Sequence, residues 1–391
     1  MSRTKSHALH SAPGWRRWLT RAGALGACLT AGTLLAATAM ARPAAPHAPA
    51  AALQKAADAL VSAGVPGVVV LTRDGDRTTT VSSGLAEVAH RTPMRPADRF
   101  RVASLAKSYT ATVVLQLVGE GKLRLGDSVE RWLPGVVPHG ERITIRELLN
   151  HTSGLADFER LPVVLKPYLS GDLGHHWSPR TLVRLAVAHK PLFAPGTGES
   201  YSSTNYLLAG LIVEARTGHS LGAELDRRIF APLHLDATTF PTTPQITGPH
   251  AHGYLVLGKP TASDVTGLSP FPWAAGATVT TAADVADFYR GLLSGRLLTP
   301  SLLAAMETTH AQRNVDFAGQ RYGLGLMRFP TSCGIAWGHN GVFPGYGAIA
   351  WTSPDGRRQA VVLINEDTGS LSHQAGALYA RLIAKAFCAT A

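Results

Sequence analysis

The chain has 391 residues, of which 45% are hydrophobic and 16% charged, and its formal net charge is +11. This composition suits a globular protein with a large core, and it excludes a disordered or fibrous chain beyond roughly the first fifty residues. The basic residues form no run interleaved with aromatics, so we do not expect a nucleic-acid partner.

The N-terminus has the features of an export signal. An uncharged stretch rich in Ala, Leu, Gly and Thr covers residues 22–41 and ends in a small-x-small sequence at Ala41. A basic region precedes it, formed by Arg16, Arg17 and Arg21. We therefore predict that residues 1–41 are a signal peptide. A membrane anchor is the alternative reading, although the many small residues make a weak span.

The export route and the mature protein follow from the same region. The arginine pair would also suit a twin-arginine signal, and Cys28 would suit a lipoprotein site. The five basic residues of the signal leave a mature charge of about +6, which suits an anionic cell wall. We expect a secreted or wall-associated monomer without a stable membrane span, with a Pro/Ala linker at 42–50 and one domain at 51–391.

Strand patterns gather at the two ends of this domain and helix patterns lie between them. The strands are expected at 68–72, 78–82, 323–327, 345–352 and 359–364, and the helices at 53–62, 104–121, 144–151, 178–230, 282–294 and 370–387. We predict an α/β fold of the α+β type. A mostly antiparallel sheet (about 51–100 and 320–391) would be flanked by helices and carry an inserted all-helical lobe (about 104–300).

The first chemical motif is Ser104-Leu105-Ala106-Lys107 at a helix start. Residues three apart on a helix share a face, so the amine can lie beside the hydroxyl. Serine needs a base in order to act as a nucleophile, and a buried lysine with a lowered pKa can supply one. Alone, this spacing is common, and the usual explanation is an N-terminal serine with an exposed lysine.

Two further motifs follow in order. Phe193-Ala194-Pro195-Gly196 precedes Tyr201-Ser202-Ser203, and Gly338-His339-Asn340-Gly341 precedes Val342. With Ser104 and Lys107 they resemble the serine β-lactamase and DD-peptidase superfamily, in its class C β-lactamase-like branch. Within it, the likeness is greatest to secreted streptomycete D-alanyl-D-alanine carboxypeptidases. The resemblance covers about residues 53–388 and implies a β-lactamase/transpeptidase-like fold.

The resemblance also implies roles for individual residues. Ser104, Lys107, Tyr201 and His339 would be catalytic, with Tyr201 as a phenolate favoured by the nearby ammonium and His339 supplying positive or hydrogen-bonding character. The N–H groups of Ser104 and Val342 would form the oxyanion hole. Substrate would contact four residues that include two departures from the family pattern: Ser203 in place of Asn, Asn340 in place of Thr, Trp273 and Gly341.

The reaction implied is acyl transfer through an acyl-serine, with D-alanyl-D-alanine carboxypeptidase activity on wall peptides and acylation by β-lactams. An esterase, a D-amino-acid amidase or a β-lactamase of the same mechanism is the alternative, and a catalytically silent binding protein is another. One departure concerns the carboxylate of the substrate. The resemblance places Met327 where the streptomycete carboxypeptidases have an arginine for this carboxylate, and an alignment shifted by one residue would place Arg328 there instead.

Cysteine and histidine positions complete the expectations. Cys333 and Cys388 are an even pair in an exported chain, so we predict a disulfide between the C-terminal helix and a strand region, with two buried thiols as the alternative. The resemblance implies the same bond. The close histidine pairs 175–176 and 250–252 make at most half a zinc site, so we expect no metal and no cofactor.

Overall fold

The computed structural model describes residues 48–255, 262–312 and 317–388. The predicted signal peptide, residues 1–41, lies outside this part of the chain. The first helix, α1 (Ala48–Ser62), begins inside the expected linker and before the predicted start at Leu53. Among the described residues, no helix combines the length and the hydropathy that crossing a membrane requires.

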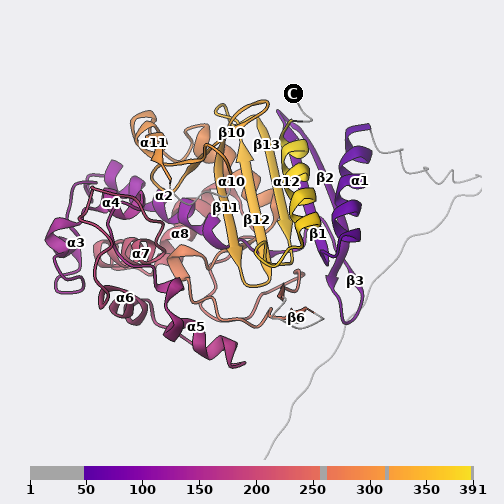
Figure 1. Cartoon of the computed structure of the whole chain (residues 1–391). Coiled ribbons are helices and arrows are strands. Elements are labelled where there is room, and N and C mark those ends of the chain that lie inside the picture. The colour runs from indigo at the N-terminus through magenta and orange to yellow at the C-terminus, as the bar shows by residue number, and fades with distance from the viewer. Residues whose placement is uncertain (1–47, 256–261, 313–316, 389–391) are drawn as a thin grey trace, which may run out of the picture. The chain divides into compact units, whose positions relative to one another are not determined.

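A nine-stranded antiparallel sheet joins the two ends of the domain (Figure 1). Strand β1 (Gly67–Asp74) pairs with β13 (Arg358–Ile364), with Val70 opposite Val362. The strand order is β3-β2-β1-β13-β12-β11-β10-β9-β8. The predicted sheet of both chain ends is therefore confirmed. Its other strands are β2 (Arg77–Glu87), β3 (Thr92–Pro93), β8 (His310–Ala311), β9 (Arg321–Tyr322), β10 (Met327–Thr331), β11 (Gly334–Phe343) and β12 (Tyr346–Thr352).

Helices cover both faces of the sheet, because its central strands are apolar on both sides. The residues of β1 and β13 are almost all buried, the pattern of strands packed on two faces. On one face α1 and α12 (His373–Cys388) pack through residues such as Leu60 and Ile383. The other face carries α10 (Ala282–Leu293), which the sequence analysis had assigned to the helical lobe.

The inserted lobe surrounds a buried helix, α2 (Ala106–Gly119), which follows a single turn, η1 (Ala103–Leu105). The expectation of an all-helical lobe is wrong, because strands occur within its range. Strand β5 (Tyr254–Leu255) pairs with β6 (Ser263–Asp264), and β7 (Val279–Thr280) pairs with β4 (Phe100–Arg101), which precedes the lobe. The α-helices are α3 (Val129–Trp132), α4 (Ile145–Leu149), α5 (Pro162–Leu169), α6 (Pro179–Val187), α7 (Thr204–Thr217), α8 (Leu221–Leu225), α9 (Ala231–Leu233) and α11 (Pro300–Glu307). The other short turns are η2 (Gly140–Arg142), η3 (Phe158–Arg160) and η5 (Trp273–Ala275), and η4 (Asp226–Phe230) is a short π-helix.

The predicted disulfide is present. Cys333 lies in the turn between β10 and β11, and Cys388 is the last residue of α12, with their Cα atoms 5.6 Å apart. The bond therefore fastens the C-terminal helix to one end of a sheet hairpin, as the even cysteine pair indicated.

Replacing both Cys333 and Cys388 by Ser should lower the free energy of unfolding by about 2–4 kcal/mol, because the crosslink restricts the unfolded chain over a long loop. Urea unfolding of the variant and the oxidised protein would measure the difference. Neither cysteine lines the pockets described below, so catalytic rates should be retained. Equal unfolding midpoints would show that the bond contributes nothing.

Candidate active site

Ser104 and Lys107 meet as the motif predicts. Ser104 is in the turn η1, and Lys107 is in the first turn of α2. The Lys107 Nζ lies 3.0 Å from Ser104 Oγ and 2.9 Å from the carbonyl oxygen of Ala275. The carbonyl therefore holds the amine below the serine hydroxyl, at a distance that permits proton transfer.

Burial prepares Lys107 to act as a base. The side chain is fully buried, and this lowers the pKa of its amine to about 8. The carboxylates of Glu159 and Asp157 act in the opposite direction, since they favour the ammonium form. A buried amine loses the hydration that stabilises its charge, so about a tenth of it is neutral at pH 7 and about half at pH 8.

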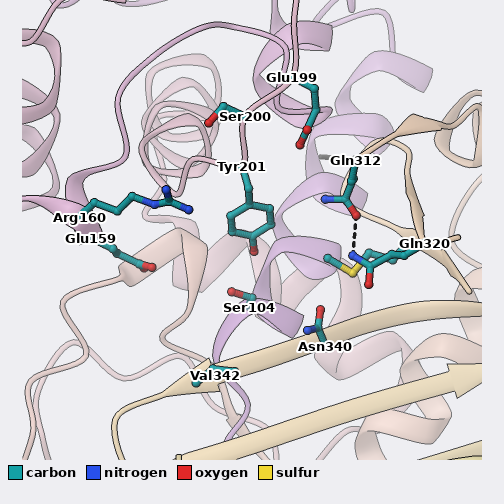
Figure 2. A pocket seen from close by; sticks show the side chains of 11 residues that line it. Ser104, Glu159, Arg160, Glu199, Ser200, Tyr201, Gln312, Gln320, Asn340 and Val342 are labelled. Carbon is teal, nitrogen blue, oxygen red and sulfur yellow. Dashed lines mark hydrogen bonds between the residues drawn. The ribbon is translucent and has the colours of Figure 1, made fainter. Parts of the chain in front are cut away.

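Tyr201 also reaches the serine, but as a neutral phenol. Its hydroxyl points toward Ser104 (Figure 2), and its ring lies 4.9 Å from Lys107 Nζ. Burial raises the pKa of the phenol, and the nearby acid Glu159 adds to this rise. The expectation of a phenolate favoured by the ammonium group is therefore wrong, because desolvation outweighs the attraction of Lys107.

His151 supports the Tyr201 ring. Its imidazole centroid lies 4.2 Å from that of Tyr201, and its Nδ1 accepts a hydrogen bond from the Ser202 amide. The residue is buried with a φ of 63°, and burial lowers the pKa of the ring, so it is neutral. His151 therefore acts as a neutral packing residue at a turn beside Tyr201.

Strand β11 brings the third motif to the nucleophile. Its pairing with β10 ends at Gly338, opposite Met327, so the following residues have a strand neighbour on the β12 side only. A Cβ at Gly341 would lie 2.3 Å from the Val102 carbonyl oxygen and 3.0 Å from the Ser104 amide nitrogen. Glycine is therefore required here for β11 to lie directly against η1.

His339 lies beneath this edge and not at the cleft surface. It is fully buried, with Nδ1 2.5 Å from the Asn340 carbonyl and Nε2 3.1 Å from the Tyr322 hydroxyl. Because a carbonyl only accepts, Nδ1 carries the proton and Nε2 accepts from Tyr322. Burial lowers the pKa of the imidazole to about 3, so the positive character considered from sequence does not fit.

Two pockets open on either side of Ser104, and Glu159 and Val342 also line both. Figure 2 shows the first, in which the Tyr201 hydroxyl points toward Ser104. It has a volume of about 300 Å³ and is also lined by Arg160, Glu199, Ser200, Tyr201, Gln312, Gln320, Met327 and Asn340. We name it the tyrosine-side pocket. The second has about 310 Å³ and is also lined by Ala103, Leu165, Phe271, Pro272, Ala275, Gly276, Phe343, Pro344 and Asp367. We name it the apolar pocket.

The residues expected to contact substrate are distributed unequally. Asn340 lines the tyrosine-side pocket, as predicted. Ser203 is fully buried and lines neither pocket, because its short side chain stays at the start of α7. Trp273 is absent from both linings as well. Its ring packs on Gly210 and near Phe240, so the prediction of a cleft-lining tryptophan is wrong.

Strand geometry shows which residue of β10, Met327 or Arg328, faces the tyrosine-side pocket. Met327 lines the tyrosine-side pocket and Arg328 does not, because successive residues of β10 point to opposite faces. The cation that does line this pocket is Arg160, whose side chain is 68% exposed and lies 3.9 Å from Asp157. No residue of β10 therefore replaces the family arginine.

Glu159 is the residue that sequence reasoning missed. It lies in η3, and only a charged run beginning at Asp157 marks it in the sequence. Burial raises the pKa of its carboxyl to about 7, and the nearby Asp157 carboxylate adds to this rise. The nearby Ser203 hydroxyl lowers the pKa of this carboxyl. Its oxygen makes no hydrogen bond of full geometry with any described residue.

A metal centre finds no support in the described part of the chain, where no three His, Cys, Asp or Glu side chains gather closely enough to hold an ion. Neither histidine pair noted in the sequence belongs to such a group. His250 and His252 stack on each other with ring centroids 5.3 Å apart, and His252 pairs with Asp264.

Comparison with known proteins identifies the family. Residues 50–385 match the Beta-lactamase family, and the chain belongs to it. Together with the serine, amine and phenol around one cleft, this membership makes the protein a serine hydrolase of the β-lactamase and penicillin-binding type.

Several relatives are similar over most of the domain. A D-stereospecific amidohydrolase from Streptomyces sp. is 38% identical, with a TM-score of 0.78, over 88% of this chain and 100% of that one. D-amino acid amidase from Ochrobactrum anthropi SV3, solved with D-phenylalanine, is 27% identical, with a TM-score of 0.77, over 86% of this chain and 97% of that one.

A D-aminopeptidase from Brucella anthropi is 27% identical over 314 residues, which are 78% of this chain and 57% of the relative. The chain thus spans little more than half the length of that curated relative. A penicillin-binding protein from Bacillus subtilis (strain 168) is 31% identical over 199 residues, which are 48% of this chain and 42% of the relative.

Replacing Gly341 by Ala should reduce kcat/KM at least about a hundredfold, because the new methyl group would force β11 away from Ser104 and misplace the reacting groups. The measurement is hydrolysis of any ester that the wild type cleaves. Gly376→Ala in α12 is the matched control, since a Cβ there meets nothing within 4 Å. Full activity of Gly341→Ala would refute the close approach of the strand.

Proposed function

We propose that this protein hydrolyses amides or short peptides of D-amino acids that carry a free α-amino group, through an acyl-Ser104 intermediate. The observation that carries the proposal is the position of Glu159. Its carboxylate lines both pockets beside Ser104. An acid at this place offers an ion pair to the α-ammonium group of an aminoacyl substrate.

The chemistry begins with Lys107 in its neutral form. The amine takes the Ser104 proton as Oγ attacks the carbonyl carbon, and the N–H groups of Ser104 and Val342 stabilise the oxyanion. Tyr201 donates its proton to the departing nitrogen and regains one from the Lys107 ammonium. Water then attacks the ester by the reverse proton route and frees the acid and Ser104.

The position of Tyr201 assigns the two sides of the cleft. The residue lines the tyrosine-side pocket and not the apolar pocket. A group that protonates the leaving nitrogen must face it, so the tyrosine-side pocket would take the leaving group. The apolar pocket would then take the side chain of the acyl residue.

The relatives support the D configuration and the amide bond. A D-stereospecific amidohydrolase and a D-amino acid amidase share the fold over more than four fifths of this chain. A D-aminopeptidase is 27% identical over 78% of this chain. The substrate class proposed here is the one that these relatives' names give. The leaving group would be ammonia from an amide or an amino acid from a peptide.

A D-alanyl-D-alanine carboxypeptidase, with β-lactam acylation as a side reaction, is the second candidate. The Arg160 guanidinium in the tyrosine-side pocket favours it, since a cation there could bind a terminal carboxylate. Against it, Arg160 is largely exposed, Asp157 is within 4 Å of it, and Met327 rather than Arg328 lines this pocket. A peptide substrate of this kind has no free amino group at the residue beside Ser104, so Glu159 would have no ammonium partner.

Secretion remains part of the proposal. The basic and apolar N-terminus suits export. The Cys333–Cys388 disulfide suits an oxidising compartment. Wall-derived D-amino acid compounds outside the cell would then be within its reach.

Replacing Glu159 by Gln should raise the KM for D-alaninamide at pH 8 at least about tenfold, because the ion pair to the ammonium group is lost. N-acetyl-D-alanine methyl ester has no such group, and its KM should change little. Steady-state kinetics of both substrates makes the comparison.

Glu141→Gln is the matched control, because this exposed acid of η2 lines neither pocket. An unchanged KM for D-alaninamide in Glu159→Gln would refute the role of Glu159. Release of D-alanine from a peptide ending in D-Ala-D-Ala, with D-alaninamide untouched, would favour the carboxypeptidase.

A further inference from the structure

The apolar pocket has two acids in its lining, Glu159 and Asp367. Its walls come from Leu165, Phe271, Pro272, Phe343 and Pro344, which offer aliphatic and aromatic surface. Asp367 joins this lining from the loop that follows β13. A hydrophobic channel with a carboxylate is complementary to a side chain that is aliphatic along its length and charged at its tip.

The Asp367 carboxylate has no cationic partner among the described residues. Its Oδ1 accepts the Gly369 amide at 2.6 Å, and no arginine or lysine lines the pocket. Burial raises the pKa of this carboxyl, and the Gly369 hydrogen bond opposes the rise. A partly buried acid without a counter-ion is costly, and an incoming cation would offset that cost.

Asp367 and Glu159 occupy different positions relative to the nucleophile. Glu159 lines both pockets together with Ser104, whereas Asp367 lines the apolar pocket alone. Glu159 thus lies near the place where the α-carbon of a substrate must be. Asp367 lies only on the side that would hold the acyl side chain. Two cations at the two ends of one residue would match the two acids.

We infer that the apolar pocket selects D-amino acids with a long cationic side chain, such as D-lysine, D-ornithine or D-arginine, and that Asp367 determines this specificity. The inference rests on the proposed function and names its substrate class. The methylene groups of such a side chain would pack on Phe271 and Leu165, and its charged end would pair with Asp367.

The test compares D-lysinamide with D-norleucinamide, which has a similar aliphatic side chain and no charge. In the wild type we expect kcat/KM to favour D-lysinamide about tenfold or more. In Asp367→Asn the preference should fall to near one, while kcat/KM for D-norleucinamide is retained. The amide oxygen of Asn can still accept the Gly369 hydrogen bond, so the loop should keep its conformation.

Asp76→Asn is the matched control, because this acid lies in an exposed turn and lines none of the pockets around Ser104. It should keep the full preference for D-lysinamide. Equal kcat/KM for the two amides in the wild type, or a preference that survives in Asp367→Asn, would overturn the inference and leave the proposed function standing. Hydrolysis of neither amide, with Ser104 still acylated by an N-acetyl ester, would overturn both.

Discussion

The burial of one amine determines how this site works. Lys107 has no exposed surface, and its Nζ hydrogen-bonds with Ser104 Oγ and the Ala275 carbonyl. Removing water from the amine disfavours its charged form and gives the serine a base with a pKa near 8. The surrounding fold, from the buried helix α2 to the turn η5, maintains this dry environment.

The two lobes supply complementary halves of the cleft. The sheet brings the free edge of β11 against η1, where only glycine fits at position 341. The helical lobe brings Tyr201, held by the His151 ring, and the acid Glu159. The strand side thus offers N–H groups to a developing oxyanion, while the helical side offers a proton donor and a site for an ammonium group. In the function that we propose, substrate specificity would depend on the acids that line the pockets beside Ser104.

The sequence predicted the parts of this arrangement that local patterns determine. Strand alternation and the Ser104–Lys107 spacing follow from helix and strand geometry, and they gave the sheet and the nucleophile with its base. Local patterns could not predict which of the site's side chains are buried. Tyr201 and His339 are neutral because side chains distant in sequence bury them, and Trp273 packs on Gly210, which is also distant in sequence. Glu159 and Asp367 carry no motif, and tertiary folding alone brings both to the nucleophile.

The pH dependence of Ser104 acylation tests the central claim most directly. N-acetyl-D-alanine methyl ester has no titrating group, so a change in its single-turnover acylation rate reports the enzyme. The rate should rise with pH through an apparent pKa near 8, as Lys107 loses its proton, and the acyl mass should map to Ser104 and vanish in Ser104→Ala. A rate independent of pH between about 6 and 10, or an acyl mass that persists in Ser104→Ala, would contradict the account.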